Sequence, residues 1–541
     1  LALLAQSSEP QCRRLRAADQ TTGTMLRSRM AQLSTRVVAP TAWRNMGLRA
    51  LSTDRKTAYR STRGGQTGLS FSEAVMQGLG KDKGLLVPEV IPSFPPGAPE
   101  CWRGLSFQEL AYEVMSLYVG PDDVPADKLK DIINRSYSTF RDSDVTPVVP
   151  ITDGLHTLEL FHGPTFAFKD VALQFLGNLY EHLLSERPGH KITVVGATSG
   201  DTGSSAIYGL RGKKGVECFI LYPDGRTSRT QELQMITVTD DNIHNIALGG
   251  TFDDCQSVVK ACFNDPEFNA HVSIAAVNSI NWARILAQMV YYVYAYLKVT
   301  PPPGSFKEAG SPPLVSFSVP TGNFGDILAG YYAKRMGLPV DQLVVATNSN
   351  DILHRFFSDG DYSVASNGVK QTISPSMDIQ ISSNFERFLF HQTGDDAAAM
   401  AKLMGNFEAT NQLLPPAELL AAARSEMVSA RVADDEVLAT IKDVHARGDG
   451  YTLDPHSAIG VAAALQVGTK PGVPMVCLAC AHWAKFPAAN RDALGDKADA
   501  LVVPEPLASL HKLPTRVNML PNSLQEVQTY IKQTLAERKQ H

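Results

Sequence analysis

Apolar and polar residues alternate along most of the chain in a strand–helix order. Short apolar or β-branched runs predict strands, at residues 155–160, 191–195, 215–222, 314–319, 343–347 and 473–479. Between them, apolar residues recur every three or four positions and predict helices, for instance at residues 171–180, 204–210, 282–297, 327–335 and 458–467. This order is typical of an α/β fold with parallel sheets flanked by helices.

The same pattern divides the chain into four parts. Residues 55–150 contain three helix-like stretches and are expected to form a mostly helical N-terminal unit. Residues 151–300 are expected to form a small α/β domain region, and residues 301–541 a large α/β domain that ends in a charged helix. Residues 1–54 differ, because no acidic residue occurs between Thr24 and Ser52 while five arginines do. This composition predicts a transit peptide or disordered extension, and therefore a mitochondrial or plastid protein, otherwise a cytoplasmic one.

Composition excludes several classes of partner. The 541 residues carry a formal net charge of −5, so no nucleic acid or anionic membrane is expected to bind. No apolar stretch is long enough to span a bilayer. The seven cysteines lack a disulfide-like spacing, and Cys477 and Cys480 lie in or beside a buried strand without a second ligand pair. We therefore expect a reducing compartment and no metal site.

Lys169 is the candidate with the most distinctive surroundings. It follows Gly163-Pro164-Thr165, a turn sequence, and lies between aromatic residues at the start of a predicted core helix. Burial among aromatic rings lowers the pKa of an ammonium group and makes the amine nucleophilic. Such a lysine suits Schiff-base chemistry with a carbonyl cofactor. The alternative is a lysine whose stem is buried while its ammonium reaches water.

Two loops that join a strand to a helix are candidate anion sites. Gly322-Asn323-Phe324-Gly325-Asp326 would present backbone N–H groups at a helix N-terminus and suits a phosphate, although it lacks the lysine of a P-loop. The loop Gly196–Gly203 includes Ser199, Gly200, Asp201 and Thr202, and suits a carboxylate or phenolic oxygen. A buried lysine, a carboxylate loop and a phosphate loop are together the parts of a pyridoxal phosphate site.

The sequence resembles the threonine synthase family, of the longer fungal and bacterial type. The matching segments are 59–64, 160–170, 196–206, 223–234, 278–288, 320–326, 374–387 and 454–460. The resemblance implies a tryptophan-synthase-β-like (fold type II) pyridoxal phosphate enzyme, a carbon–oxygen lyase of threonine biosynthesis. Its implied reaction converts O-phospho-L-homoserine and water to L-threonine and phosphate. It also implies a monomer or a homodimer.

The resemblance assigns roles residue by residue. Lys169 matches the Schiff-base lysine, residues 322–326 match the cofactor-phosphate loop, and residues 199–202 match the loop for the substrate carboxylate. Where the family has a threonine against the pyridine nitrogen, this chain has Cys480, and Trp483 replaces a proline. A thiol is a weaker hydrogen-bond partner than a hydroxyl. Asn281 and Arg284 are candidates for binding the substrate phosphate.

Three other functions are compatible with these residues. One is a phospho-lyase of the same fold that releases 2-oxobutyrate, because sequence does not decide how water is held. A threonine or serine dehydratase is disfavoured by the long N-terminal unit. A non-catalytic metabolite-binding homologue would be expected to lack Lys169 or the phosphate loop, and both are present.

Overall fold

The computed structural model describes residues 57–302, 312–447 and 450–538. The transit peptide expected over residues 1–54 lies outside the described residues. An antiparallel pair of strands and three helices begin the described chain: β1 (Tyr59–Ser61), β2 (Leu86–Pro88), α2 (Phe71–Gln77), α3 (Phe107–Met115) and α4 (Ala126–Tyr137). Helices α2 and α3 both begin with a reciprocal serine–glutamate capping box, which satisfies free N–H groups of the first turn.

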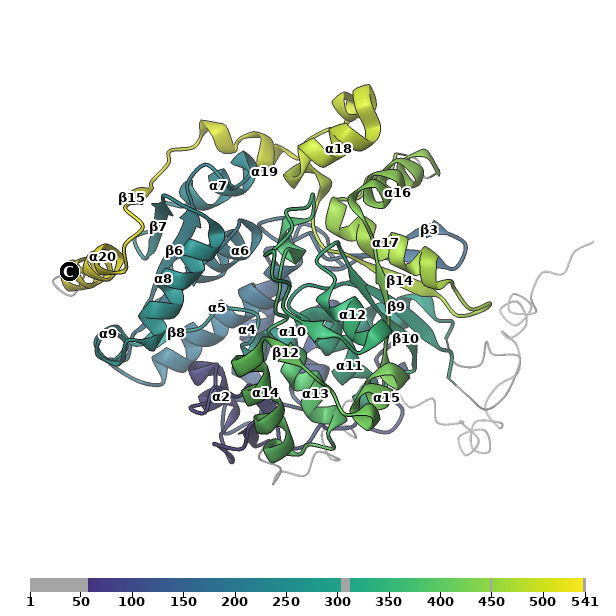
Figure 1. The fold of residues 1–541 in the computed structure, drawn as a ribbon, viewed down its shortest axis with the longest axis horizontal. Helices are drawn as coiled ribbons and strands as arrows, with labels where there is room; N and C mark the ends of the chain where they lie inside the picture. Colours follow the sequence, from purple (N-terminus) through teal and green to yellow (C-terminus); the bar gives the residue numbers. More distant parts are fainter. Residues whose placement is uncertain (1–56, 303–311, 448–449, 539–541) are drawn as a thin grey trace, which may run out of the picture. The chain divides into compact units, whose positions relative to one another are not determined.

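A five-stranded parallel sheet occupies the left of Figure 1. Its strands, in the order β15-β7-β6-β5-β8, are β15 (Asn518–Leu520), β7 (Ile243–Leu248), β6 (Val216–Pro223), β5 (Ile192–Ala197) and β8 (Ile274–Ala275). The helices around it are α6 (Asp201–Leu210), α7 (Arg229–Ile236), α8 (Phe252–Asn264), α9 (Pro266–Val272) and α20 (Leu524–Glu537). β6 and β7 are buried along their whole length, as expected of strands covered on both faces.

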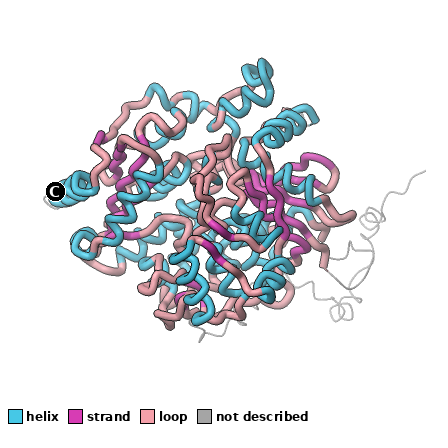
Figure 2. The backbone as a smooth tube through the Cα atoms, in the orientation of Figure 1, coloured by secondary structure: helices cyan, strands magenta, loops and turns pink. Residues whose placement is uncertain are grey.

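A six-stranded sheet lies on the other side, and Figure 2 shows the two groups of strands standing apart. Its order is β13 (Val428–Arg431), β10 (Val340–Thr347), β9 (Val315–Pro320), β14 (Met475–Ala479), β4 (Leu155–Glu159) and β3 (Val148–Thr152). All its pairs are parallel except β3 with β4. Its helices are α11 (Gly325–Met336), α12 (Ile352–Asp359), α16 (Asp434–Arg447), α17 (Pro455–Val467) and α18 (Pro487–Leu494).

Two long buried helices, α5 (Lys169–Ser185) and α10 (Trp282–Val299), join the parts of the described chain. α5 packs on α6 of the first sheet, and α10 packs on both α5 and α11. Residues 282–297 of α10 are all buried.

The remaining elements are β11 (Tyr362–Ser363), β12 (Gln412–Leu413), α13 (Phe385–Gln392), α14 (Ala397–Thr410), α15 (Ala417–Glu426), α19 (Glu505–Ala508) and the 3-10 turns Glu100–Trp102, Pro375–Met377, Trp483–Lys485, Gly495–Ala500 and Leu510–Lys512.

The two sheets do not divide the chain at residue 300. β4, expected in the small region, pairs with β14 of the six-stranded sheet, and β15 from the C-terminal end joins the five-stranded sheet. This strand pairing does not decide where the domains begin and end, so the expected boundaries stay a prediction. The expected fold class, parallel sheets flanked by helices, is confirmed. Among the described residues, no helix is long and apolar enough to cross a membrane.

Candidate active site

Lys169 is the first residue of α5 and is buried. Its Nζ lies 4.6 Å from the centre of the Phe168 ring and 3.8 Å from Asp201 Oδ2. Burial lowers the pKa of this amine, and the positive charges of Lys485 and Arg284 lower it further, whereas Asp201 opposes the shift. The lysine is therefore a buried amine with a larger neutral fraction than an exposed lysine has, which is the state a nucleophile needs.

The loop before Lys169 is fixed by hydrogen bonds to its own helix and to the residues after β14. The backbone N–H and the hydroxyl of Thr165 both donate to the Asp170 carboxylate. Phe166 adopts a left-handed conformation with φ of 58°, which is rare for a bulky residue. Its carbonyl accepts from His482, and Phe168 donates to the Cys480 carbonyl at 2.7 Å. These bonds offset the strain and orient Lys169.

Asp201 begins α6 and connects three parts of the site. Its Oδ1 accepts from Lys485 Nζ at 2.6 Å and from Gln231 Nε2 at 2.8 Å. Burial alone would raise the pKa of this carboxyl, but the two lysines hold it well below the usual range. Lys485 is fully buried and also donates to the Thr165 carbonyl at 2.9 Å. Sequence reasoning missed Lys485, although it lies five residues after Cys480 in the segment compared with the family.

The loop of residues 199–202 reaches its conformation through Gly200. Its φ is 147°, and a Cβ there would lie 2.5 Å from Gln231 Cδ, so only glycine fits. Thr198 Oγ1 accepts from the backbone N–H groups of Gly200 and Gly203, while Ser199 and Thr202 are half-buried. The ionised Asp201 would repel a carboxylate, so the groups available to bind one are the hydroxyls and N–H groups beside it.

The loop of residues 322–326 connects β9 to α11 and fits a phosphate. Two carbonyls of this loop already accept hydrogen bonds within the protein: Gly322 O from Ser382 Oγ, and Asn323 O from the Asn384 side chain. Phe324 takes a left-handed conformation with φ of 62° at the start of the helix. A Cβ on Gly322 would lie 3.2 Å from Ser376 O. The N-terminal N–H groups and dipole of the twelve-residue helix α11 favour an anion here.

Asp326 is the last residue of the phosphate loop, and its charge acts on Cys480. Asp326 Oδ1 accepts from the hydroxyls of Tyr291 and Tyr292, while Oδ2 is buried without a hydrogen-bond partner in the described part of the chain. Burial raises the pKa of this carboxyl to about 6. The buried Cys480 thiol interacts with Asp326 and Lys169, and burial first, then Asp326, raise its pKa well above normal. The thiol therefore stays protonated, makes a weak contact with the Leu478 carbonyl at 3.8 Å, and is a weak hydrogen-bond donor or acceptor.

The two candidates for binding the substrate phosphate differ in their surroundings. Asn281 caps α10, and its Nδ2 is hydrogen-bonded to Val75 O, Tyr180 Oη and Ala276 O. Arg284 is buried, donates to Val277 O at 3.1 Å and makes no ion pair within the described residues. Its Nε has no partner there, and burial lowers its pKa to about 10. An uncompensated buried guanidinium suits an anionic ligand.

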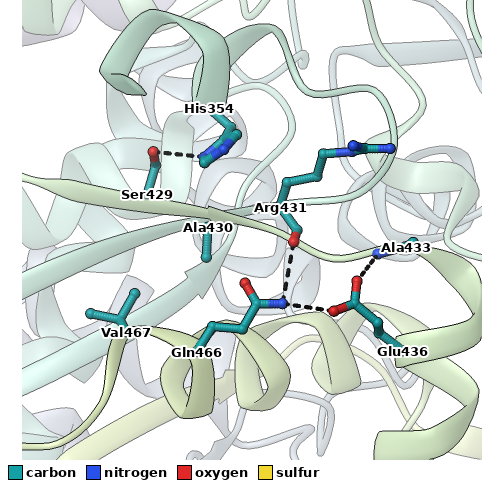
Figure 3. Close-up of a pocket in the computed structure, with 8 residues that line it drawn as sticks. All are labelled: His354, Ser429, Ala430, Arg431, Ala433, Glu436, Gln466 and Val467. Atoms are coloured by element: carbon teal, nitrogen blue, oxygen red, sulfur yellow. Dashed lines mark hydrogen bonds between the residues drawn. The ribbon is translucent and has the colours of Figure 1, made fainter. Parts of the chain in front are cut away.

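A cavity of about 400 Å³ opens at the end of β13, away from Lys169. His354, Ser429, Arg431, Glu436 and Gln466 contribute polar groups to its lining (Figure 3). These groups bond mainly to one another or to nearby backbone: His354 to Ser429, and Gln466 to Glu436 and the Arg431 carbonyl. The cavity therefore does not share the chemistry around Lys169.

The chain matches known protein families over most of its length. Residues 58–137 match the family "Threonine synthase N terminus", residues 155–405 "Pyridoxal-phosphate dependent enzyme", and residues 457–531 "Threonine synthase, C-terminal". The chain is 50% identical to a threonine synthase of Schizosaccharomyces pombe over 82% of this chain and 90% of that protein. It is 46% identical to one of Pseudomonas aeruginosa over 88% and 98%.

The fold is also similar to the solved structures of two threonine synthases. The fold matches yeast threonine synthase with a TM-score of 0.83 and 44% identity, over 89% of this chain and 99% of that one. It matches PLP-bound threonine synthase from Brucella melitensis with a TM-score of 0.82 and 45% identity, over 88% and 99%.

Proposed function

The chain belongs to the threonine synthase family of pyridoxal phosphate-dependent enzymes, and we propose that its active site forms around Lys169. There the enzyme converts O-phospho-L-homoserine and water into L-threonine and phosphate. The observation that carries the assignment of the site is the buried Lys169, whose amine has a lowered pKa. Its Nζ lies 3.8 Å from Asp201 of one loop, and its charge acts on Asp326 of the other loop. The other buried lysine of the described chain, Lys485, holds Asp201 in a closer contact of 2.6 Å, against 3.8 Å for Lys169, and is also bonded to the Thr165 carbonyl.

The cofactor would be held at three points. Lys169 would hold its aldehyde, the N-terminus of α11 with Gly322, Asn323, Phe324 and Gly325 would hold its phosphate, and Cys480 with Asp326 would border its ring. Pyridoxal phosphate supplies an electron sink for a carbanion next to the amino-bearing carbon. The unpartnered Oδ2 of Asp326 and the left-handed loop at Phe324 support this fit.

The substrate would be held by its two anionic ends. Ser199, Gly200 and Thr202 offer hydroxyl and N–H donors to the carboxylate, and Arg284 offers a guanidinium to the phosphate. Asn281 orients the start of α10, which carries Arg284, because its own polar atoms are already bonded within the protein. The phosphate of the substrate is its leaving group. Held against Arg284, it would depart with negative charge that the guanidinium stabilises.

The protein's own contribution to proton transfer is the amine of Lys169. Its lowered pKa allows Nζ to accept a proton from the substrate carbon and to return it later in the cycle. Lys485 supports this by neutralising Asp201, which would otherwise hold Lys169 in its protonated form. Asp201 therefore positions the two lysines rather than binding substrate directly.

The test is turnover of O-phosphohomoserine by the purified chain loaded with pyridoxal phosphate. We expect phosphate and threonine in equal amounts, and loss of both in Lys169→Ala. Lys298→Ala, a surface lysine at the far end of α10, is the matched control and should keep full activity. Phosphate accompanied by 2-oxobutyrate instead of threonine would replace this proposal with the phospho-lyase.

A further inference from the structure

A second cavity lies next to the loop that carries Lys169. Its volume is about 460 Å³, within the range of small-molecule sites, and it is bordered by α5, α6, α7 and the C-terminal arm, residues 501–538. Lys169, Asp201 and Lys485 are not among its lining residues. The Thr165 carbonyl connects the two sites, because it accepts from Lys485 and also from Gln234, which lines the cavity.

Two buried amide groups in the lining have unused hydrogen-bonding capacity. Gln174 is 7% exposed and Gln234 is 2% exposed. Gln174 Nε2, a donor, and Gln234 Oε1, an acceptor, have no partner in the described part of the chain. Buried polar atoms without partners are costly and rare, so a pair of them around one cavity indicates a ligand. That ligand would offer one acceptor and one donor.

The charge in the cavity comes from Arg141. Its guanidinium stacks 3.7 Å from the centre of the Phe166 ring and donates to the carbonyls of Gly163 and Pro164. It makes no ion pair among the described residues, and the nearby Asp170 carboxylate is already bonded to Thr165. Arg211, which also lines the cavity, is paired with Asp240 at 2.7 Å. The lining therefore has a net positive charge available for a carboxylate.

We propose that this cavity is an effector site for a small α-amino acid with an apolar side chain. The ligand carboxylate pairs with Arg141. Gln174 Nε2 and Gln234 Oε1 each have less than 1 Å² of accessible surface, so the two amides turn toward the cavity as the ligand binds. Gln174 Nε2 then donates to the carboxylate, and Gln234 Oε1 accepts from the ammonium group. The side chain packs against Leu507 and Leu510 of the C-terminal arm, which line the same cavity. Because Arg141 and Gln234 also bond to the carbonyls of residues 163–165, occupancy alters the loop that orients Lys169.

The probe is L-valine, added to the holoenzyme, with binding measured by calorimetry and turnover of O-phosphohomoserine measured in parallel. Isobutylamine, which lacks the carboxylate, and 3-methylbutanoate, which lacks the amine, test the two charges. Gln174→Leu removes the donor, and we expect it to weaken valine binding about tenfold, the value of one buried hydrogen bond to a charged group. Gln466→Leu, in the cavity of Figure 3, is the matched control.

A second variant, Leu507→Trp, fills the cavity from the C-terminal arm and tests the site without changing a polar group. The visible absorption of the cofactor is recorded as a control, because valine that binds at the Lys169 site instead would change it. Support requires three results: valine binds and changes turnover in the unaltered enzyme and in Gln466→Leu, its binding weakens about tenfold in Gln174→Leu, and both effects are lost in Leu507→Trp. Equal binding of 3-methylbutanoate, unchanged turnover, or valine effects that survive both cavity variants would each overturn the proposal.

Discussion

At the scale of single residues, the site depends on a chain of buried charges. Lys485 pairs with Asp201, and Asp201 lies 3.8 Å from Lys169. Two lysines therefore share one carboxylate, and burial works against both positive charges. Burial lowers the pKa of Lys169, Asp201 opposes this shift, and the positive charge of Lys485 adds to it.

Lys485→Met should move the pH dependence of turnover. The positive charge of Lys485 lowers the pKa of Lys169, so its removal raises that pKa and shifts the acidic limb of the kcat profile to higher pH. Breaking this buried pair also costs about 3–5 kcal/mol of folding free energy. The measurement is kcat against pH with thermal unfolding alongside. Lys334→Met, which breaks a pair with Glu426 far from Lys169, should leave the profile in place.

Arg284→Met should separate substrate binding from folding. Arg284 has no carboxylate partner within the described residues, so its loss leaves no unpaired buried anion. We expect KM for O-phosphohomoserine to rise roughly 10–100-fold, the value of a lost hydrogen bond to a charged group. Arg424→Met, which removes bonds to two carbonyls of α12, is the control. An unchanged KM in Arg284→Met would remove Arg284 from the phosphate site.

At the scale of elements, the distance between α5 and α6 sets the distance between Lys169 and Asp201. Each helix begins with one of these residues. The two helices touch through glycines: a Cβ on Gly177 would lie 1.9 Å from Gly209 O, and a Cβ on Gly209 would lie 2.4 Å from Leu173 O. Backbone cannot move aside as a flexible side chain can, so the helices cross this closely only with glycine at both positions.

Gly177→Ala should therefore damage both stability and activity. Helix propensity alone favours alanine by about 1 kcal/mol, but the contact with backbone overrides this preference and costs roughly 1–3 kcal/mol or more. Gly405→Ala in α14 is the matched control, because nothing lies within 4 Å of the added Cβ. Its stability should rise by about 0.5–1 kcal/mol. Urea unfolding and kcat measure both effects, and a Gly177→Ala enzyme with unchanged kcat would contradict the argument.

Sequence patterns predict long elements better than pairings between distant parts. The strand of residues 215–222 appears as β6, and the apolar helix of residues 282–297 appears as α10. The short strands β13 and β15 were not predicted, because four and three residues carry too little periodicity. Lys485 was missed for a different reason: a lone lysine in a sequence looks exposed, and only the fold brings it to Asp201.

At the scale of the whole chain, the C-terminal end completes the first sheet. After α19 and two 3-10 turns, Gly495–Ala500 before it and Leu510–Lys512 after it, β15 pairs in parallel with β7, and α20 packs against α8. Val527 and Ile531 of α20 are fully buried in a cluster with Phe219 and Leu221 of β6. Arg538 adds contacts to Glu217 and to the Asp241 carbonyl. The sheet that presents Asp201 therefore depends on residues more than 300 positions later in the sequence.

Ile531→Ala tests this dependence. Removing a fully buried isoleucine side chain costs about 2–5 kcal/mol, because the lost contacts and the remaining cavity both count. Thr529→Ala, an exposed position on the same helix, should change stability by less than about 0.5 kcal/mol. Urea unfolding measures the loss. Because Lys169 and the phosphate loop lie outside this cluster, kcat at a temperature where the variant is folded should stay near the normal value. A large fall in kcat under those conditions would mean that α20 acts on the site itself, and a loss below about 0.5 kcal/mol would mean that β15 and α20 are dispensable for the sheet.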